Sequence, residues 1–69
     1  MNDWLAARAR ALGVDDLRPD EISLLLNLAG DAAHDSGQRT NAPLLCYLVG
    51  RAQGDRPLEE LVEIVRSTS

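Results

Sequence analysis

Glycine and proline interrupt this chain of 69 residues at short intervals, and their positions limit how long any secondary structure element can be. Proline suits the first turn of a helix, where its missing amide hydrogen would have no intrahelical partner, and glycine commonly ends a helix. The interrupting residues are Gly13, Pro19, Gly37, Pro43, Gly54 and Pro57. Between them, apolar residues recur with helical spacing and do not alternate as in a strand. We therefore predict an all-α fold, a compact bundle of four short helices that forms a single domain over residues 1–69.

Start and stop signals define the limits of the four expected helices. These limits are Asn2 or Asp3 to Leu12, about Pro19 to His34 or Asp35, a cap at Thr40 or Asn41 to a stop at Gly54, and a cap at Asp55 with Pro57 in the first turn. The last helix has the clearest amphipathic pattern, because Leu58, Leu61, Val62 and Val65 follow the spacing of one helix face. We expect this face to be buried.

The second and third helices have more apolar surface than one neighbour can cover. The face of the second helix that we expect to be buried consists of Ile22, Leu25, Leu26, Ala29 and Ala33. Leu24 and Leu28 add a further apolar flank, and Gly50 in the third helix would let another backbone approach closely. Because such helices need neighbours on several sides, we predict a homo-oligomer, most simply a dimer, or docking onto a larger protein.

The two aromatic residues, Trp4 and Tyr47, leave a mainly aliphatic core to hold the domain together. We expect Trp4 to pack the first helix against the fourth, and Tyr47 to pack in the core with its hydroxyl at the rim. Aromatic side chains are also enriched where proteins bind one another, so both residues are interface candidates. The candidate interface consists of Trp4, Leu24, Leu28, Tyr47 and Gly50.

The charge distribution argues against several classes of partner. Seven basic and eleven acidic residues give a net charge of −4, and the arginines are scattered along the chain. Proteins that bind nucleic acid or anionic membranes concentrate positive charge on one face, so we expect neither partner. No apolar run approaches the roughly 20 residues that cross a bilayer, and the first residues do not resemble a secretory signal. Since Cys46 is the only cysteine, no intrachain disulfide is possible, and we predict a cytoplasmic protein.

One polar cluster lies near the junction of the second and third helices. Asp31, His34 and Asp35 are spaced to share one side of a helix. There a carboxylate can orient the imidazole ring of His34, or the carboxylate and the imidazole can bind the same ligand. Arg39 and the free amide groups near Asn41 suit a carboxylate or a phosphate. The same residues also suit an ordinary helix end, with His34 near the negative end of the dipole and Arg39 paired to Asp31 or Asp35. Asp31, His34, Arg39 and Asn41 are therefore candidate ligand-binding or partner-binding residues, and both interpretations stay open.

We expect no catalytic residues, no metal site and no cofactor. A zinc site needs further ligands beyond one histidine and its neighbouring carboxylates, and the chain offers no evident pair of nucleophile and base. Cys46 lies in the apolar third helix, where a small buried side chain is expected and a reactive thiol is not. The chain is therefore not expected to be an enzyme.

Four short motifs stand out along the chain: Asp3-Trp4-Leu5, Asp31-Ala32-Ala33-His34 with Arg39, Ala42-Pro43-Leu44, and Tyr47-Leu48-Val49-Gly50-Arg51-Ala52. With them the chain resembles a small uncharacterised bacterial helical domain of unknown function, which occurs alone or fused to the C-terminus of molybdenum cofactor guanylyltransferases. The resemblance spans nearly the whole chain and implies an association with the synthesis of molybdopterin-guanine dinucleotide. It draws attention to Asp31, His34, Arg39, Pro43 and Gly50 without assigning them a role. The chain has no glycine-rich nucleotide loop, so guanylyl transfer itself is not implied.

Two hypotheses follow. In the first, the chain is a non-catalytic accessory module that associates with itself and docks onto an enzyme of molybdenum cofactor synthesis or use. In the second, it is a small-molecule binding module that holds an anionic pterin or nucleotide at the junction of the second and third helices.

Overall fold

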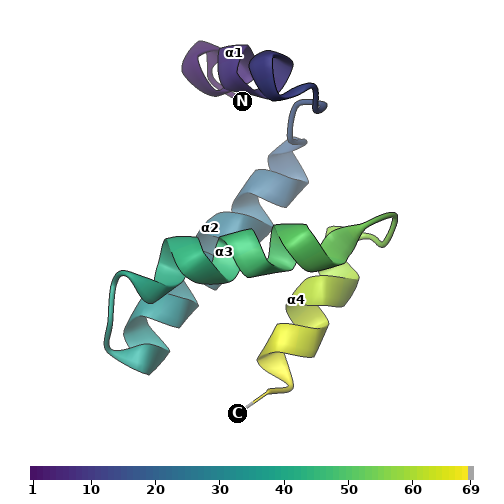
Figure 1. The fold of residues 1–69 in the computed structure, drawn as a ribbon. Coiled ribbons are helices and arrows are strands. Elements are labelled where there is room, and N and C mark those ends of the chain that lie inside the picture. Colours follow the sequence, from purple (N-terminus) through teal and green to yellow (C-terminus); the bar gives the residue numbers. More distant parts are fainter. Residues whose placement is uncertain (69) are drawn as a thin grey trace.

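The structure, a computed structural model, describes residues 1–68, and within that range it contains four α-helices and no strand. The helices are α1 (Asp3–Leu12), α2 (Pro19–Ser36), α3 (Asn41–Gln53) and α4 (Leu58–Arg66), as Figure 1 shows. The predicted all-α fold of four short helices is confirmed. None of these helices combines the length and the apolar character that crossing a membrane requires.

The first two helices begin and end close to where their residues predict. The Asn2 side-chain oxygen accepts a hydrogen bond of 2.9 Å from the amide of Leu5 and so caps α1. Gly13 and Gly37 follow α1 and α2 with φ of 74° and 70°, a left-handed conformation that glycine adopts without steric cost. α2 runs through Ser36, slightly past its predicted end, because Gly37 is the first residue to leave the helical conformation.

The predicted side-chain caps of α3 and α4 are not formed. Thr40 precedes α3, but its side chain makes no capping hydrogen bond. α4 begins at Leu58, with Pro57 just before its first turn, and not directly after Asp55. A proline disfavours the helical conformation of the residue before it, which is consistent with Arg56 lying outside the helix. The start of α4 is therefore set by Pro57 and not by a carboxylate cap from Asp55.

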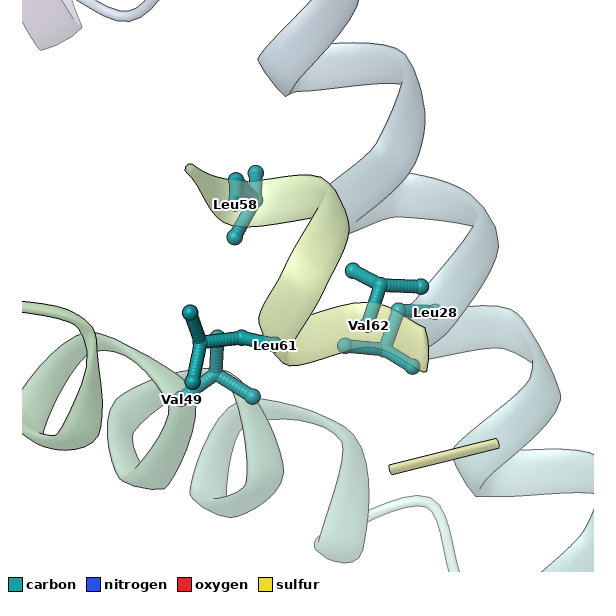
Figure 2. Close-up of a cluster of buried hydrophobic side chains, with 5 residues drawn as sticks. All are labelled: Leu28, Val49, Leu58, Leu61 and Val62. Carbon is teal, nitrogen blue, oxygen red and sulfur yellow. The ribbon is translucent and has the colours of Figure 1, made fainter. Parts of the chain in front are cut away.

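α2, α3 and α4 pack around a small aliphatic core. The buried cluster contains Leu28 from α2, Val49 from α3, and Leu58, Leu61 and Val62 from α4 (Figure 2). The apolar face predicted for α4 therefore supplies most of this cluster. Partly buried side chains that pack against the cluster are Leu24, Leu25, Leu45 and Val65.

The buried side of α2 differs from the predicted one. Leu26, which was expected in the core, is 68% exposed, whereas Leu28, which was expected at an interface, is only 1% exposed. Leu24 also lies against the core and not on an open flank. Both predictions for α2 were wrong because the helix is apolar around most of its circumference, so its sequence does not show which side meets α3 and α4.

α1 does not pack against the other helices. No Cα atom of α1 lies within 8 Å of a Cα atom in α2, α3 or α4, and Figure 1 shows α1 beyond the N-terminal end of α2. The prediction that Trp4 packs the first helix against the fourth is therefore wrong. Trp4 is 62% exposed, and its ring stacks on the Arg8 guanidinium, whose carbon lies 3.9 Å from the ring centre.

Candidate functional site: an apolar groove between three helices

A groove of about 870 Å³ lies between the C-terminal half of α2, the first half of α3 and the end of α4. Leu28, Leu45 and Val65 contribute to its lining and to the core, so the base of the groove is apolar. Its polar residues come from helix ends, where side chains reach solvent. The remaining lining residues are Asp31, Ala32, Asp35, Ser36, Asn41, Leu44, Leu48, Arg66 and Thr68.

Leu44 and Leu48 are the most exposed apolar side chains of the groove, at 60% and 56%. They lie one turn apart on α3, and they face outward because Leu45 and Val49 direct another side of this helix into the core. A single exposed leucine is ordinary in a soluble protein, but two leucines beside an apolar base form a patch. An amphipathic helix covers such a patch by inserting its own apolar side chains.

An ion pair connects two helices at the rim of the groove. Arg66 Nη2 of α4 lies 3.3 Å from Asp31 Oδ2 of α2, and both side chains are more than half exposed. Among the described residues that line the groove, Arg66 is the one cation, whereas Asp31 and Asp35 are both anions. Because Arg66 is paired, the negative charge of Asp35 is left in excess. The lining therefore favours an apolar or cationic occupant over an anion.

The polar cluster predicted from the sequence is divided in the structure. Asp31 and Asn41 line the groove, but His34 and Arg39 do not. His34 lies about a third of a turn around α2 from the lining residues, and its Nδ1 is 3.4 Å from Asp35 Oδ1. Arg39 does not pair with Asp31 or Asp35, contrary to expectation. Instead, Asp31 pairs with Arg66, and Asp35 contacts the His34 ring.

The five predicted interface residues occupy different environments. Trp4 and Tyr47 are exposed, so the expectation that Tyr47 packs in the core is wrong. Leu28 is buried in the core, and Leu24 is half-buried against it. Gly50 is exposed, and apart from its chain neighbours and the nearby backbone of α3, no described atom lies within 4 Å of the position that a Cβ would take. The close backbone approach expected at Gly50 is therefore not present within this chain.

Three residues of the groove were not recognised from the sequence as parts of one site: Leu44, Leu48 and Arg66. The spacing of Leu44 and Leu48 does indicate a shared helix face, but other apolar residues of α3 hide which face stays open. Arg66 lies on α4 outside the apolar stripe of this helix, and nothing local in the sequence indicates a partner on α2. It meets Asp31 only because α4 packs beside the end of α2.

The groove offers apolar contact and weak ion pairing as its chemistry. Cys46 is partly buried on α3 and does not line the groove. Within residues 1–68, no three side chains of His, Cys, Asp or Glu gather as potential metal ligands. The site is thus suited to binding another surface through its exposed leucines.

A family model described as "Domain of unknown function (DUF6457)" matches residues 1–69. No curated protein and no solved structure matches the chain. The family match spans all four helices and includes every residue of the groove. The groove and its charges are consequently the features that point to a function.

Proposed function

The chain belongs to the DUF6457 family, and from its groove we propose that it is a non-catalytic interaction module that receives an apolar helix of a protein partner. The observation that carries this proposal is the exposure of Leu44 and Leu48 beside the apolar base of the groove. Recognition of an amphipathic helix typically uses apolar anchors that enter such a groove at helical spacing. Asp31 and Asp35 at the rim add a preference for a helix that carries basic residues.

The extent of exposed surface supports a partner. The chain has 5362 Å² of solvent-accessible surface, whereas a compact monomer of 7.5 kDa has about 4,200 Å². The excess of about 1,100 Å² is comparable to the roughly 800 Å² that each partner buries in a stable interface. Large apolar side chains contribute to it, among them Trp4, Leu44, Tyr47 and Leu48.

We propose two kinds of partner, a second copy of the chain and a larger enzyme of molybdenum cofactor synthesis or use. The second is supported by the motifs that resemble a domain fused to molybdenum cofactor guanylyltransferases. Three of these motifs contribute residues to the groove: Asp31-Ala32-Ala33-His34, Ala42-Pro43-Leu44 and Tyr47-Leu48-Val49-Gly50-Arg51-Ala52. A helix bound there would contact residues on which the resemblance rests.

Binding of an anionic pterin or nucleotide has less support from the site. His34 and Arg39, the cationic candidates for that role, lie outside the groove lining. Inside it, Asp35 repels an anion, and the Arg66 guanidinium is already paired with Asp31. The charges therefore favour a protein helix as the occupant.

The test compares two leucines of similar exposure, one in the groove and one outside it. Leu48→Asp places a charge in the groove, whereas Leu26→Asp places the same charge on α2 away from the groove lining. Self-association is measured by light scattering, and binding to a purified molybdenum cofactor guanylyltransferase is measured by calorimetry. We expect Leu48→Asp to weaken at least one of these associations tenfold or more, and Leu26→Asp to leave both unchanged.

Two results would count against the interaction module. One is a wild-type chain that remains monomeric and binds no enzyme of this class. The other is an association that Leu48→Asp does not weaken. A thermal shift with guanosine triphosphate that is lost in Arg39→Ala would instead favour the ligand-binding alternative.

A further inference from the structure

α1 carries an apolar stripe whose two leucines, Leu5 and Leu12, stay exposed in the structure of the chain. Leu5, Ala9 and Leu12 follow the i, i+4, i+7 spacing of one helix face, and α1 packs against none of the other helices. Leu5 is 40% exposed and Leu12 is 77% exposed, whereas Ala9 between them is already buried. A helix of 10 residues is only marginally stable alone in water, so α1 needs a surface that covers this stripe.

The charge of α1 is opposite to that of the remaining chain. Residues 1–12 carry Arg8 and Arg10 against one acidic residue, Asp3, which gives a net charge of +1. Residues 13–69 carry five arginines against ten acidic residues, which gives −5 and accounts for the total of −4. α1 therefore has the basic character that the rim carboxylates of the groove favour, namely Asp31 and Asp35.

The positions of α1 and the groove favour binding of α1 in the groove of a second copy over binding in the groove of its own copy. α1 joins the N-terminal end of α2 (Figure 1). The groove is lined by residues from the C-terminal half of α2. With 18 residues, α2 is about 27 Å long and separates the two. A two-fold axis that sets the α2 helices of two copies antiparallel brings α1 of each copy to the groove of the other.

We propose that α1 of a second copy occupies the groove, so that two copies exchange their first helices reciprocally. This inference rests on the proposed function, because it names the helix that the groove receives. Leu5 and Leu12 cover Leu44 and Leu48, while Arg8, which flanks the stripe, lies near the carboxylates of the rim. The exchange removes the surface excess from each copy, since that excess matches the area that a stable dimer buries per subunit.

The chain contains its own reporter of this exchange. Trp4 is the single tryptophan, it lies on α1, and it is 62% exposed in the unexchanged structure. Burial of α1 in a partner's groove moves the Trp4 emission to shorter wavelength. We expect this shift to grow with protein concentration, in step with the dimer fraction that light scattering measures on the full chain.

Matched variants separate exchange from other kinds of association. Leu12→Asp disrupts the stripe of α1 and Leu48→Asp disrupts the groove, so each is expected to raise the dimer dissociation constant tenfold or more and to abolish the emission shift. Ala7→Asp, on the opposite side of α1, and Leu26→Asp, outside the groove, are controls that leave both readouts unchanged. All four positions are exposed or outside the core cluster, so circular dichroism is expected to show helical content like that of wild type.

The results that would contradict the helix exchange differ from those that would contradict the groove as a binding site. A dimer that Leu48→Asp weakens but Leu12→Asp does not would overturn the exchange and leave the groove as a site for another helix. An emission shift that both variants remove but that does not depend on concentration shows α1 folded onto its own chain, which also overturns the exchange. A chain that is monomeric throughout has no exchange, and the enzyme titration then decides the proposed function alone.

Discussion

The guanidinium of Arg66 lies 3.3 Å from the carboxylate of Asp31, joining the last turn of α4 to the C-terminal half of α2 at the rim of the groove. The end of α2, all of α3 and most of α4 separate the two residues in the sequence, so their meeting depends on the packing of three helices. The pair also occupies Arg66, the one cation among the described residues that line the groove, so this cation is not available to bind a ligand. It thereby links the architecture of the groove to its preference for an apolar or basic helix.

Reversal of this ion pair is expected to change stability by a small and recoverable amount. Arg66→Asp places a second carboxylate beside Asp31 and should lower the free energy of unfolding by up to about 1 kcal/mol, because the pair is exposed to solvent. Adding Asp31→Arg should restore most of the loss. Urea unfolding at low and high salt measures both effects, and the difference between variants should shrink at high salt. Equal stability of the single and double variants would show that the pair contributes nothing.

Shortening Leu28 is expected to destabilise the fold far more than shortening Leu26. Leu28 is 1% exposed at the centre of the core, so Leu28→Ala leaves a cavity and should cost about 2–5 kcal/mol, enough to unfold much of a domain this small. Leu26 is 68% exposed, so Leu26→Ala should change stability by no more than about 0.5 kcal/mol. Thermal unfolding followed by circular dichroism distinguishes the two. Similar losses from both variants would contradict the orientation of α2.

Two glycine substitutions are expected to have opposite effects. Gly50 lies within α3 with open space around it, so Gly50→Ala should raise the free energy of unfolding by about 1 kcal/mol through helix propensity. Gly13 has a φ of 74°, so Gly13→Ala should lower it by about 1–2 kcal/mol because a Cβ is strained there. Chemical denaturation provides the measurement. If Gly50→Ala also weakens self-association, another copy lies against Gly50 in the oligomer, as the sequence had suggested.

The start of α2 is expected to respond to acid through Asp20. Arg18 Nε donates a hydrogen bond of 3.2 Å to Asp20 Oδ1, and this bond together with the positive charge of Arg18 lowers the pKa of Asp20 below its usual value of 3.8. A lowered pKa in the folded state means that the stabilisation is present above pH 3.8 and is lost as the pH falls through the lowered pKa. Asp20→Asn should therefore flatten the loss of stability that accompanies a fall in pH below 3.8. Parallel curves for the two proteins would show that the bond is not formed in solution.

Most of the helix limits could be predicted from the sequence because they depend on neighbouring residues. Asn2 caps α1 and Gly37 ends α2 through conformations and hydrogen bonds that involve only a few positions. The exception is the start of α4, where Asp55 looks like a cap but the helix begins only after Pro57, which disfavours a helical Arg56. Here two local preferences compete, and the restriction before proline is the stronger.

The candidate site was only half predictable. Asp31 and Asn41 were singled out because polar residues at a helix junction suit binding, and both line the groove. His34 and Arg39 were grouped with them by sequence distance, but they lie outside the lining. The exposed pair of Leu44 and Leu48 was concealed by the generally apolar composition of α3.

By itself, the sequence determined four short helices, their main boundaries and the buried face of α4, since backbone restrictions and a clean amphipathic pattern act over a few residues. The tertiary structure alone decided that Leu28 is buried and Leu26 exposed, that Arg66 meets Asp31, and that α1 stands apart from the other three helices. A helix that is apolar on several sides has alternative packings that differ little in local energy. The choice among them depends on contacts summed over all the helices, which no single segment encodes.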